Sequence, residues 1–196
     1  MARPKIPASA GSKLVRDFVE RLIVSGKKLQ YTDVPLNTKP GTRTTLKPDV
    51  VYTSGKPGAR NAAGQPIKYV YTTDSQGRIA SAHARPLELP EQNTRGPHTS
   101  TTPGKQSGDH AGHLIADMFG GSGKLDNLVS QASDVNKKKM AALERRWKKR
   151  LSKTPPEVID VDIEVLYDAT GTRPTGFNVY ELVDGMSVPV GNFTNK

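Results

Sequence analysis

Hydrophobic positions follow two different periods along this chain, which predicts a mixture of helices and strands. Residues 12–25 place their apolar side chains on one helical face, with Ser12 as the N-cap and Gly26 as the stop. Residues 133–153 predict a second helix, which ends before Pro155.

Alternating positions predict strands between and after these helices. Residues 67–82 and 176–191 each indicate a β-hairpin, the second turning at Asp184-Gly185, and residues 161–168 indicate a half-buried strand. Residues 84–108 have almost no periodicity and predict a long loop, and long loops in compact domains are often functional. The predicted fold class is α+β.

Composition narrows the classes of function. The 196 residues include no cysteine, which excludes disulfides and thiol chemistry, and the formal net charge of +10 favours a polyanionic partner over ordinary solubilising charge. No apolar run has the ~18 residues of a membrane span, and the first residues lack an apolar signal core. We therefore expect no membrane span, and export would need a carrier or a larger parent chain.

Candidate chemistry begins in residues 108–131, where His110 and His113 precede a glycine cluster. Zinc is one interpretation, although His83 and His98 fall in predicted loops without ligand spacing. A general base and a plain packed turn are the others. The GGSGK run at residues 120–124 is not a phosphate-binding loop, because no Ser or Thr follows the lysine, and it indicates a tight turn.

A second cluster lies on the predicted helix. Asn136 and Glu144 are eight residues apart, which on an α-helix offsets them by about 80° and ~12 Å. A hydrated cation would provide partners for this amide and carboxylate, whereas the alternative is an Asn in the first turn and a Glu paired with Arg145 or Lys148. The basic residues of this helix predict either a solvated face or phosphate contacts.

The run from Asp109 to Leu151 resembles the DNA/RNA non-specific endonucleases, which are ββα-metal-finger nucleases, and is most similar to the branch found as C-terminal toxin domains in bacteria. That family has an Asp-Arg-Gly-His-type motif, an Asn-x-x-Pro-Gln motif and a helix with an Asn and, eight residues later, a Glu. The matching positions are His113, Asn127, Gln131, Asn136 and Glu144, with Ser130 in place of the proline.

The resemblance covers roughly residues 65–192 and implies a ββα-metal-finger core with flanking antiparallel hairpins and an N-terminal helix. We expect residues 1–60 to form the helix and an extended arm, and residues 61–196 to form the nuclease domain. The implied function is metal-dependent, sequence-non-specific hydrolysis of DNA, with RNA as a second candidate substrate. The alternatives are a non-catalytic basic nucleic-acid-binding protein and an enzyme for another anionic substrate.

The resemblance also implies roles for individual residues. His113 is the expected general base, Asn136 holds one Mg²⁺ (or Mn²⁺) ion, and Glu144 holds the water molecules of that ion. Asn127 is expected to be catalytic, and Arg95, with Arg85 as a second candidate, to clamp the phosphate. We further expect Lys137, Lys138, Arg145 and Lys148 to contact the nucleic-acid backbone. Asp109 or His110 is expected to orient His113, and Gln131 is expected to support the site.

A nuclease of this kind would kill the cell that makes it. The resemblance therefore implies a secreted antibacterial toxin, delivered by a secretion system, that acts in the target-cell cytoplasm. An acidic immunity protein is then expected to cover the basic surface in the producing cell.

Overall fold

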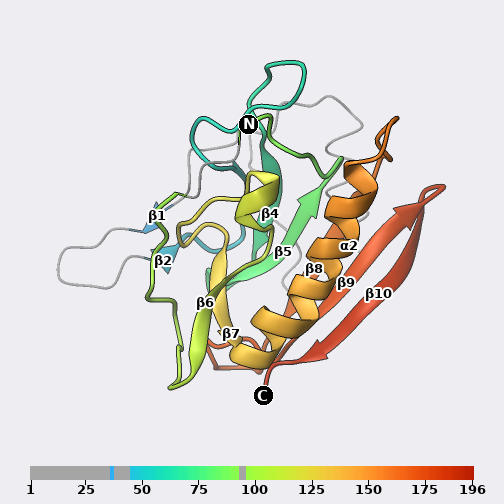
Figure 1. Ribbon diagram of the computed structural model, residues 1–196. Helices are drawn as coiled ribbons and strands as arrows, with labels where there is room; N and C mark the ends of the chain where they lie inside the picture. The colour runs from blue at the N-terminus through green and yellow to red at the C-terminus, as the bar shows by residue number, and fades with distance from the viewer. Residues whose placement is uncertain (1–35, 38–44, 93–95) are drawn as a thin grey trace.

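The computed structural model describes residues 36–37, 45–92 and 96–196, and its centre is a six-stranded antiparallel sheet (Figure 1). The strand order is β10-β9-β8-β5-β4-β3. These strands are β3 (Val51–Ser54), β4 (Tyr69–Thr73), β5 (Ile79–Ala84), β8 (Asp160–Leu166), β9 (Gly176–Val183) and β10 (Met186–Thr194).

Two smaller sheets and a set of helices complete the described part of the chain. The small sheets pair β1 (Leu36–Asn37) with β2 (Thr45–Leu46), and β6 (Asp109–His113) with β7 (Leu128–Ala132). The helices are η1 (Asp117–Phe119), the π-helical turn η2 (Val135–Met140) and α2 (Ala141–Leu151). Within the described ranges, no helix has the length and apolar character that crossing a membrane requires.

The α+β class and the predicted hairpins are confirmed. β4 pairs with β5, and β9 pairs with β10 around Asp184 and Gly185, which both have positive φ angles, as a two-residue hairpin turn requires. The helix predicted over residues 133–153 is present as η2 and α2. The helix predicted over residues 12–25 lies outside the described residues.

The predicted boundary at residue 60 needs a correction. β3 falls within the segment expected to be an arm, yet it pairs along its whole length with β4 as an edge strand of the central sheet. Its Tyr52 is completely buried and stacks on Tyr71, with ring centroids 5.3 Å apart. The described residues just before residue 60 therefore belong to the sheet, because their side chains form part of its core.

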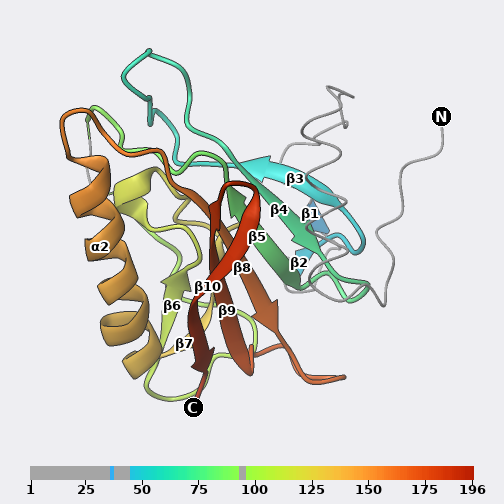
Figure 2. The same ribbon diagram turned by 90° about the vertical axis from the view of Figure 1, so that its right-hand side faces the viewer.

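One face of the sheet is apolar and supports the rest of the fold. A single row of paired positions crosses five strands, and each of its side chains is fully buried: Tyr52, Tyr71, Ala82, Ile163 and Val179. β6, β7 and α2 lie on one side of the sheet (Figure 2). Burial of this row against them provides the main driving force for the fold.

Helix α2 is fixed to the sheet by one buried carboxylate. Glu181 on β9 accepts hydrogen bonds from Trp147 Nε1 at 2.8 Å, Arg146 Nη2 at 2.8 Å and Arg150 Nη1 at 2.5 Å. Trp147 also packs edge-on against Phe119, with ring centroids 6.4 Å apart. These contacts fix the rotation of α2, so they decide which of its residues face outward.

The opposite face of the sheet carries a buried polar network. His83, which the sequence places in a loop, lies on β5 and its Nδ1 is 2.7 Å from Oδ1 of Asp162. Its Nε2 is 2.8 Å from the Ser81 hydroxyl, and Arg85 Nη2 donates to Asp162 Oδ2 at 2.6 Å. Burial alone would raise the pKa of Asp162, but the hydrogen bonds from His83 and Arg85 hold that pKa below its ordinary value.

Asp162→Asn should lower the free energy of unfolding at pH 7 by about 3–5 kcal/mol, because it removes the buried carboxylate charge that His83 and Arg85 contact. Because the folded-state pKa of Asp162 is depressed, this contribution is present above the unfolded pKa of about 4 and is lost as pH falls through the folded pKa. Urea unfolding at pH 7 and pH 3 measures both effects. Glu164→Gln, on the same face of β8, is the matched control, and equal unfolding midpoints for the two variants would contradict the assignment.

Candidate active site

The predicted site residues that the structure describes are carried by one continuous unit. β6 ends at His113, β7 returns antiparallel to it, and η2 and α2 follow directly (Figure 1). His113 pairs with Leu128 at the end of the two strands where the connecting loop begins, and its side chain is half-buried. The loop of residues 114–127 joins these two positions and therefore forms the surroundings of His113.

Asn127 closes this loop with four hydrogen bonds and is fully buried. Its Oδ1 accepts from Ile115 N at 2.9 Å and from the Tyr71 hydroxyl at 3.0 Å, and its Nδ2 donates to Ile115 O at 2.9 Å and Ser122 O at 2.7 Å. These bonds use both acceptor positions of the amide oxygen and both N–H donors of the amide nitrogen. We therefore assign Asn127 a positioning role in place of the catalytic contact expected from the sequence.

Tyrosine hydroxyls from the sheet hold the same loop from below. Tyr52 donates to Asp126 O at 2.7 Å and Tyr69 donates to Phe119 O at 2.5 Å. The Asp126 carboxylate accepts from Ser54 on β3 and, at 2.8 Å, from Ser122 within the loop. Burial raises the pKa of Tyr52 and Tyr69 well above the ordinary range, so both remain hydroxyl donors at any pH that the fold tolerates.

Gln131 supports His113 through the backbone. Its fully buried side chain crosses β6 at Gly112, where a Cβ atom would lie 2.2 Å from Gln131 Oε1. Nε2 of Gln131 makes a long contact of 3.4 Å to the carbonyl oxygen of His113. Gly112 is therefore required by the close approach of this amide, and Gln131 lies beside His113 as expected.

Neither candidate for orienting the base directly contacts it. Asp109 lies four strand residues from His113, about 13 Å away, and both of its carboxylate oxygens accept from Arg173 at 2.8 Å. The hydrogen bonds from Arg173 lower the pKa of Asp109. His110 is three residues from His113, so strand alternation places it on the other face. The ion pair between Asp109 and Arg173 instead links β6 to the loop after β8.

A second imidazole, which the sequence did not single out, lies beside His113. The ring centroids of His98 and His113 are 6.2 Å apart and the rings are tilted by 44°. The backbone N–H of Thr99 donates to Gly123 O at 2.8 Å, which ties the segment carrying His98 to the loop of residues 114–127. Sequence spacing could not show this contact, because it joins an irregular segment to the end of a strand through the tertiary fold.

The helix differs from the prediction in its first turns. Residues 135–140 form a π-helical turn, in which N–H groups bond five residues back and each residue contributes less rotation than in an α-helix. The predicted offset of about 80° between Asn136 and Glu144 assumed α-helical geometry throughout. The π turn reduces that offset, so Asn136 and Glu144 lie closer to one line along the helix.

Glu144 has the properties of a cation ligand. Burial raises the pKa of its carboxyl to about 7, although nearby Arg145 acts to lower it. Within the described ranges, the carboxyl makes no hydrogen bond or ion pair, and the same holds for the Asn136 amide. A partly buried carboxylate without a partner fits a divalent cation, which would keep it ionised at neutral pH.

A closed site of the structural zinc type does not form in the part of the chain that the structure describes. No group of three or more His, Cys, Asp or Glu side chains gathers there as a set of metal ligands. An Asn and a single carboxylate instead leave most positions around an ion to water and substrate, as Mg²⁺ prefers.

The basic residues of the helix divide into two groups. Arg146 and Arg150 are committed to Glu181, as described above. The four residues expected to contact nucleic acid are all exposed: Lys137, Lys138, Arg145 and Lys148. The charge of Lys138 is partly neutralised by Asp134, whose carboxylate lies 2.8 Å from its Nζ. Arg85 is engaged with Asp162, which argues against its role as a phosphate clamp. Arg95, the other expected clamp, lies outside the described residues.

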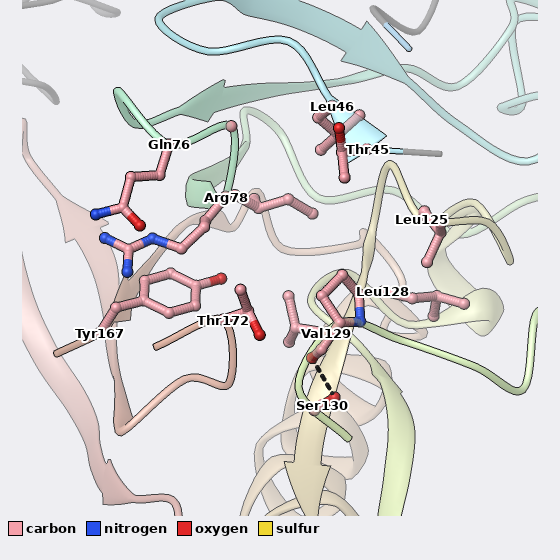
Figure 3. A pocket seen from close by; sticks show the side chains of 13 residues that line it. Thr45, Leu46, Gln76, Arg78, Leu125, Leu128, Val129, Ser130, Tyr167 and Thr172 are labelled. Atoms are coloured by element: carbon pink, nitrogen blue, oxygen red, sulfur yellow. Dashed lines mark hydrogen bonds between the residues drawn. The ribbon is translucent and has the colours of Figure 1, made fainter. Parts of the chain in front are cut away.

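A separate hollow lies between β2, β7 and the turn of the β4–β5 hairpin (Figure 3). Leu46, Ile79 and Leu128 contribute apolar side chains to its lining. Arg78 lies 4.4 Å from the ring centroid of Tyr167 and is ion-paired with Asp74. None of His113, Asn136 and Glu144 lines this hollow, so it is not the predicted site.

Comparison with known proteins agrees with this geometry. A profile of the DNA/RNA non-specific endonuclease family matches residues 59–185, more than half of the chain. The chain belongs to this family. The matched region runs from the segment before β4 to the turn after β9 and includes β6, β7 and α2.

Similar proteins include the type VII secretion system protein EssD of Staphylococcus aureus, in strains USA300 and NCTC 8325 / PS 47. Each is 36% identical over 128 residues, which are 61% of this chain and 20% of the relative. The chain thus spans about a fifth of the length of these relatives. A solved structure of Sda1 nuclease with bound zinc ion has a TM-score of 0.49 and 15% identity, covering 76% of this chain and 84% of the other.

Asn127→Asp should destabilise the protein strongly, because it removes both donors to the carbonyl oxygens of Ile115 and Ser122. Each buried group left without a partner costs about 1–3 kcal/mol, so the loss of cleavage should accompany a lower melting temperature. Asn61→Asp is the matched control, because Asn61 uses only its side-chain oxygen, as an acceptor from Ala63 N and Gln65 N. Thermal unfolding of both variants tests the assignment, and a stable but inactive Asn127→Asp would restore the catalytic role.

Proposed function

We propose that this endonuclease is metal-dependent and sequence-non-specific, and that it hydrolyses DNA and also RNA. The observation that carries the proposal is the partly buried carboxyl of Glu144, which has no described hydrogen-bond partner on the helix that also carries Asn136. Family membership favours this enzyme over the non-catalytic nucleic-acid-binding protein. The ββα order of β6, β7 and the helix supports a metal-finger site.

The residues of the chain divide the chemistry between them. His113, as a neutral imidazole, accepts the proton of the attacking water, which is the task of a general base near neutral pH. Asn136 would hold the ion directly, and Glu144 would hold its water molecules. A bound divalent cation supplies positive charge that stabilises the phosphate and the leaving oxygen. Exposed Lys137, Arg145 and their neighbours hold the phosphate backbone, which is independent of sequence.

We also propose that the enzyme is a secreted toxin that acts in the cytoplasm of target cells. The EssD relatives are type VII secretion system proteins, which supports delivery by such a system. The formal net charge of +10 supports an acidic immunity protein as the partner in the producing cell.

A digestion assay tests the proposed activity. Plasmid DNA and a structured RNA should both be cut with Mg²⁺ and not with excess EDTA, and cutting should fall steeply between ~50 and ~200 mM salt, because phosphate contacts release counterions. Full activity in excess EDTA would contradict the proposed metal dependence. Binding of DNA without any cutting would favour the binding protein.

His113→Ala should reduce cleavage by about 10²–10⁴-fold, because it removes the base and leaves the basic surface in place. The melting temperature and the affinity for duplex DNA should stay close to those of the wild-type protein. His110→Ala should cost less, since its side chain is on the other face of β6. An active His113→Ala beside an inactive His110→Ala would show that the base is misassigned.

Asn136→Ala should be more damaging than Glu144→Gln, because a direct ligand affects metal binding and turnover together, whereas a partner acting through water typically costs 10–100-fold. Raised Mg²⁺ should rescue Glu144→Gln better than Asn136→Ala. The wild-type affinity for Mg²⁺ should rise as pH increases through about 7, because the ion displaces the proton of Glu144. Mg²⁺ titrations of cleavage from pH 6 to 8 measure these effects, and equal, unrescued losses would contradict the assigned roles.

A further inference from the structure

We propose that His98 is a second imidazole of the active site, which donates a hydrogen bond to the same phosphate group that His113 faces. This inference rests on the proposed nuclease function and adds a substrate-binding residue to it. The observation that carries it is the separation of 6.2 Å between the two ring centroids.

The position of His98 is fixed by backbone contacts. Besides the bond from Thr99 N to Gly123 O at 2.8 Å, the segment packs directly against Gly123. A Cβ atom on Gly123 would lie 2.8 Å from Pro97 O and 3.2 Å from both Cα and Cβ of His98. The glycine run at residues 120–124 thus permits the close approach of His98, which gives Gly123 a function beyond a tight turn.

The separation of the rings suits a bound phosphate. A hydrogen bond extends about 3 Å from a ring nitrogen to its acceptor, so one tetrahedral phosphate can meet both imidazoles at this spacing. An imidazole always carries at least one N–H group, so the ring of His98 can donate this hydrogen bond.

A purely structural role does not fit the side chain. His98 is exposed, and within the described ranges its ring makes no hydrogen bond or ion pair. An exposed ring contributes little to the core, yet its backbone is held against Gly123 in the loop that follows His113. His113 is half-buried on its strand, so the exposed His98 borders the side from which a long substrate can approach.

The test compares variants that keep or remove the donor. His98→Ala and His98→Phe should lower kcat/KM on a short DNA duplex about 10- to 100-fold, as expected for a lost hydrogen bond to a charged group. His98→Gln, which keeps an N–H donor, should recover much of this loss, and free imidazole in the buffer should partly rescue His98→Ala but not His98→Phe. Melting temperatures should stay unchanged. Thr101→Ala, an exposed residue of the same segment, is the matched control.

The outcomes separate this inference from the proposed function. If the wild-type protein cuts no nucleic acid, the proposed function fails. If it cuts and His98→Ala keeps the kcat/KM of Thr101→Ala, only the role of His98 is overturned. Equal activity of His98→Phe and His98→Gln would also overturn it, because a hydrogen-bond donor at this position requires the Gln variant to be the more active of the two.

Discussion

Four hydrogen bonds meet at the buried amide of Asn127, and the arrangement around His113 depends on them. They join the end of β6, the glycine turn, the start of β7 and, through Tyr71, the central sheet. In a buried environment each of these groups would cost free energy if it lost its partner. The loop after His113 therefore has one low-energy arrangement, and this fixes both the exit of β6 and the position of Gly123.

The sheet acts as a rigid support with two different faces. On one face, tyrosine rings fill the core while their hydroxyls reach the loop of residues 114–127. On the other, His83, Asp162 and Arg85 form a buried polar network that needs all its partners to be stable. Sites held by such rigid elements keep their geometry better than sites built on free loops.

The charges on η2 and α2 illustrate how packing assigns roles to similar residues. Glu181 engages Arg146 and Arg150, which lie on the side of the helix towards the sheet. Lys137, Arg145 and Lys148 remain exposed and available to a phosphate backbone. A strongly basic helix thus serves two purposes, because one side stabilises the fold by ion pairs and the other attracts a polyanion.

The sequence by itself determined the fold class, the hairpins and the second helix. Hydrophobic period, turn residues and motif spacing are local properties, so they can be read without coordinates. The family resemblance, which the profile match confirms, rested on the same local spacing.

Only the tertiary structure decided which polar side chains are engaged in hydrogen bonds or ion pairs within the fold. Asn127 matches the expected motif, and Asp109 lies one residue away from the first position of the Asp-Arg-Gly-His-type motif. Their partners Tyr71 and Arg173 are distant in sequence, and these contacts link separate elements of the fold. The proximity of His98 to His113 also depends on the fold, because loop segments carry no periodic signal. The physical reason is that hydrogen bonding and burial depend on neighbours in space, whereas spacing along the chain reports only on neighbours within one helix or strand.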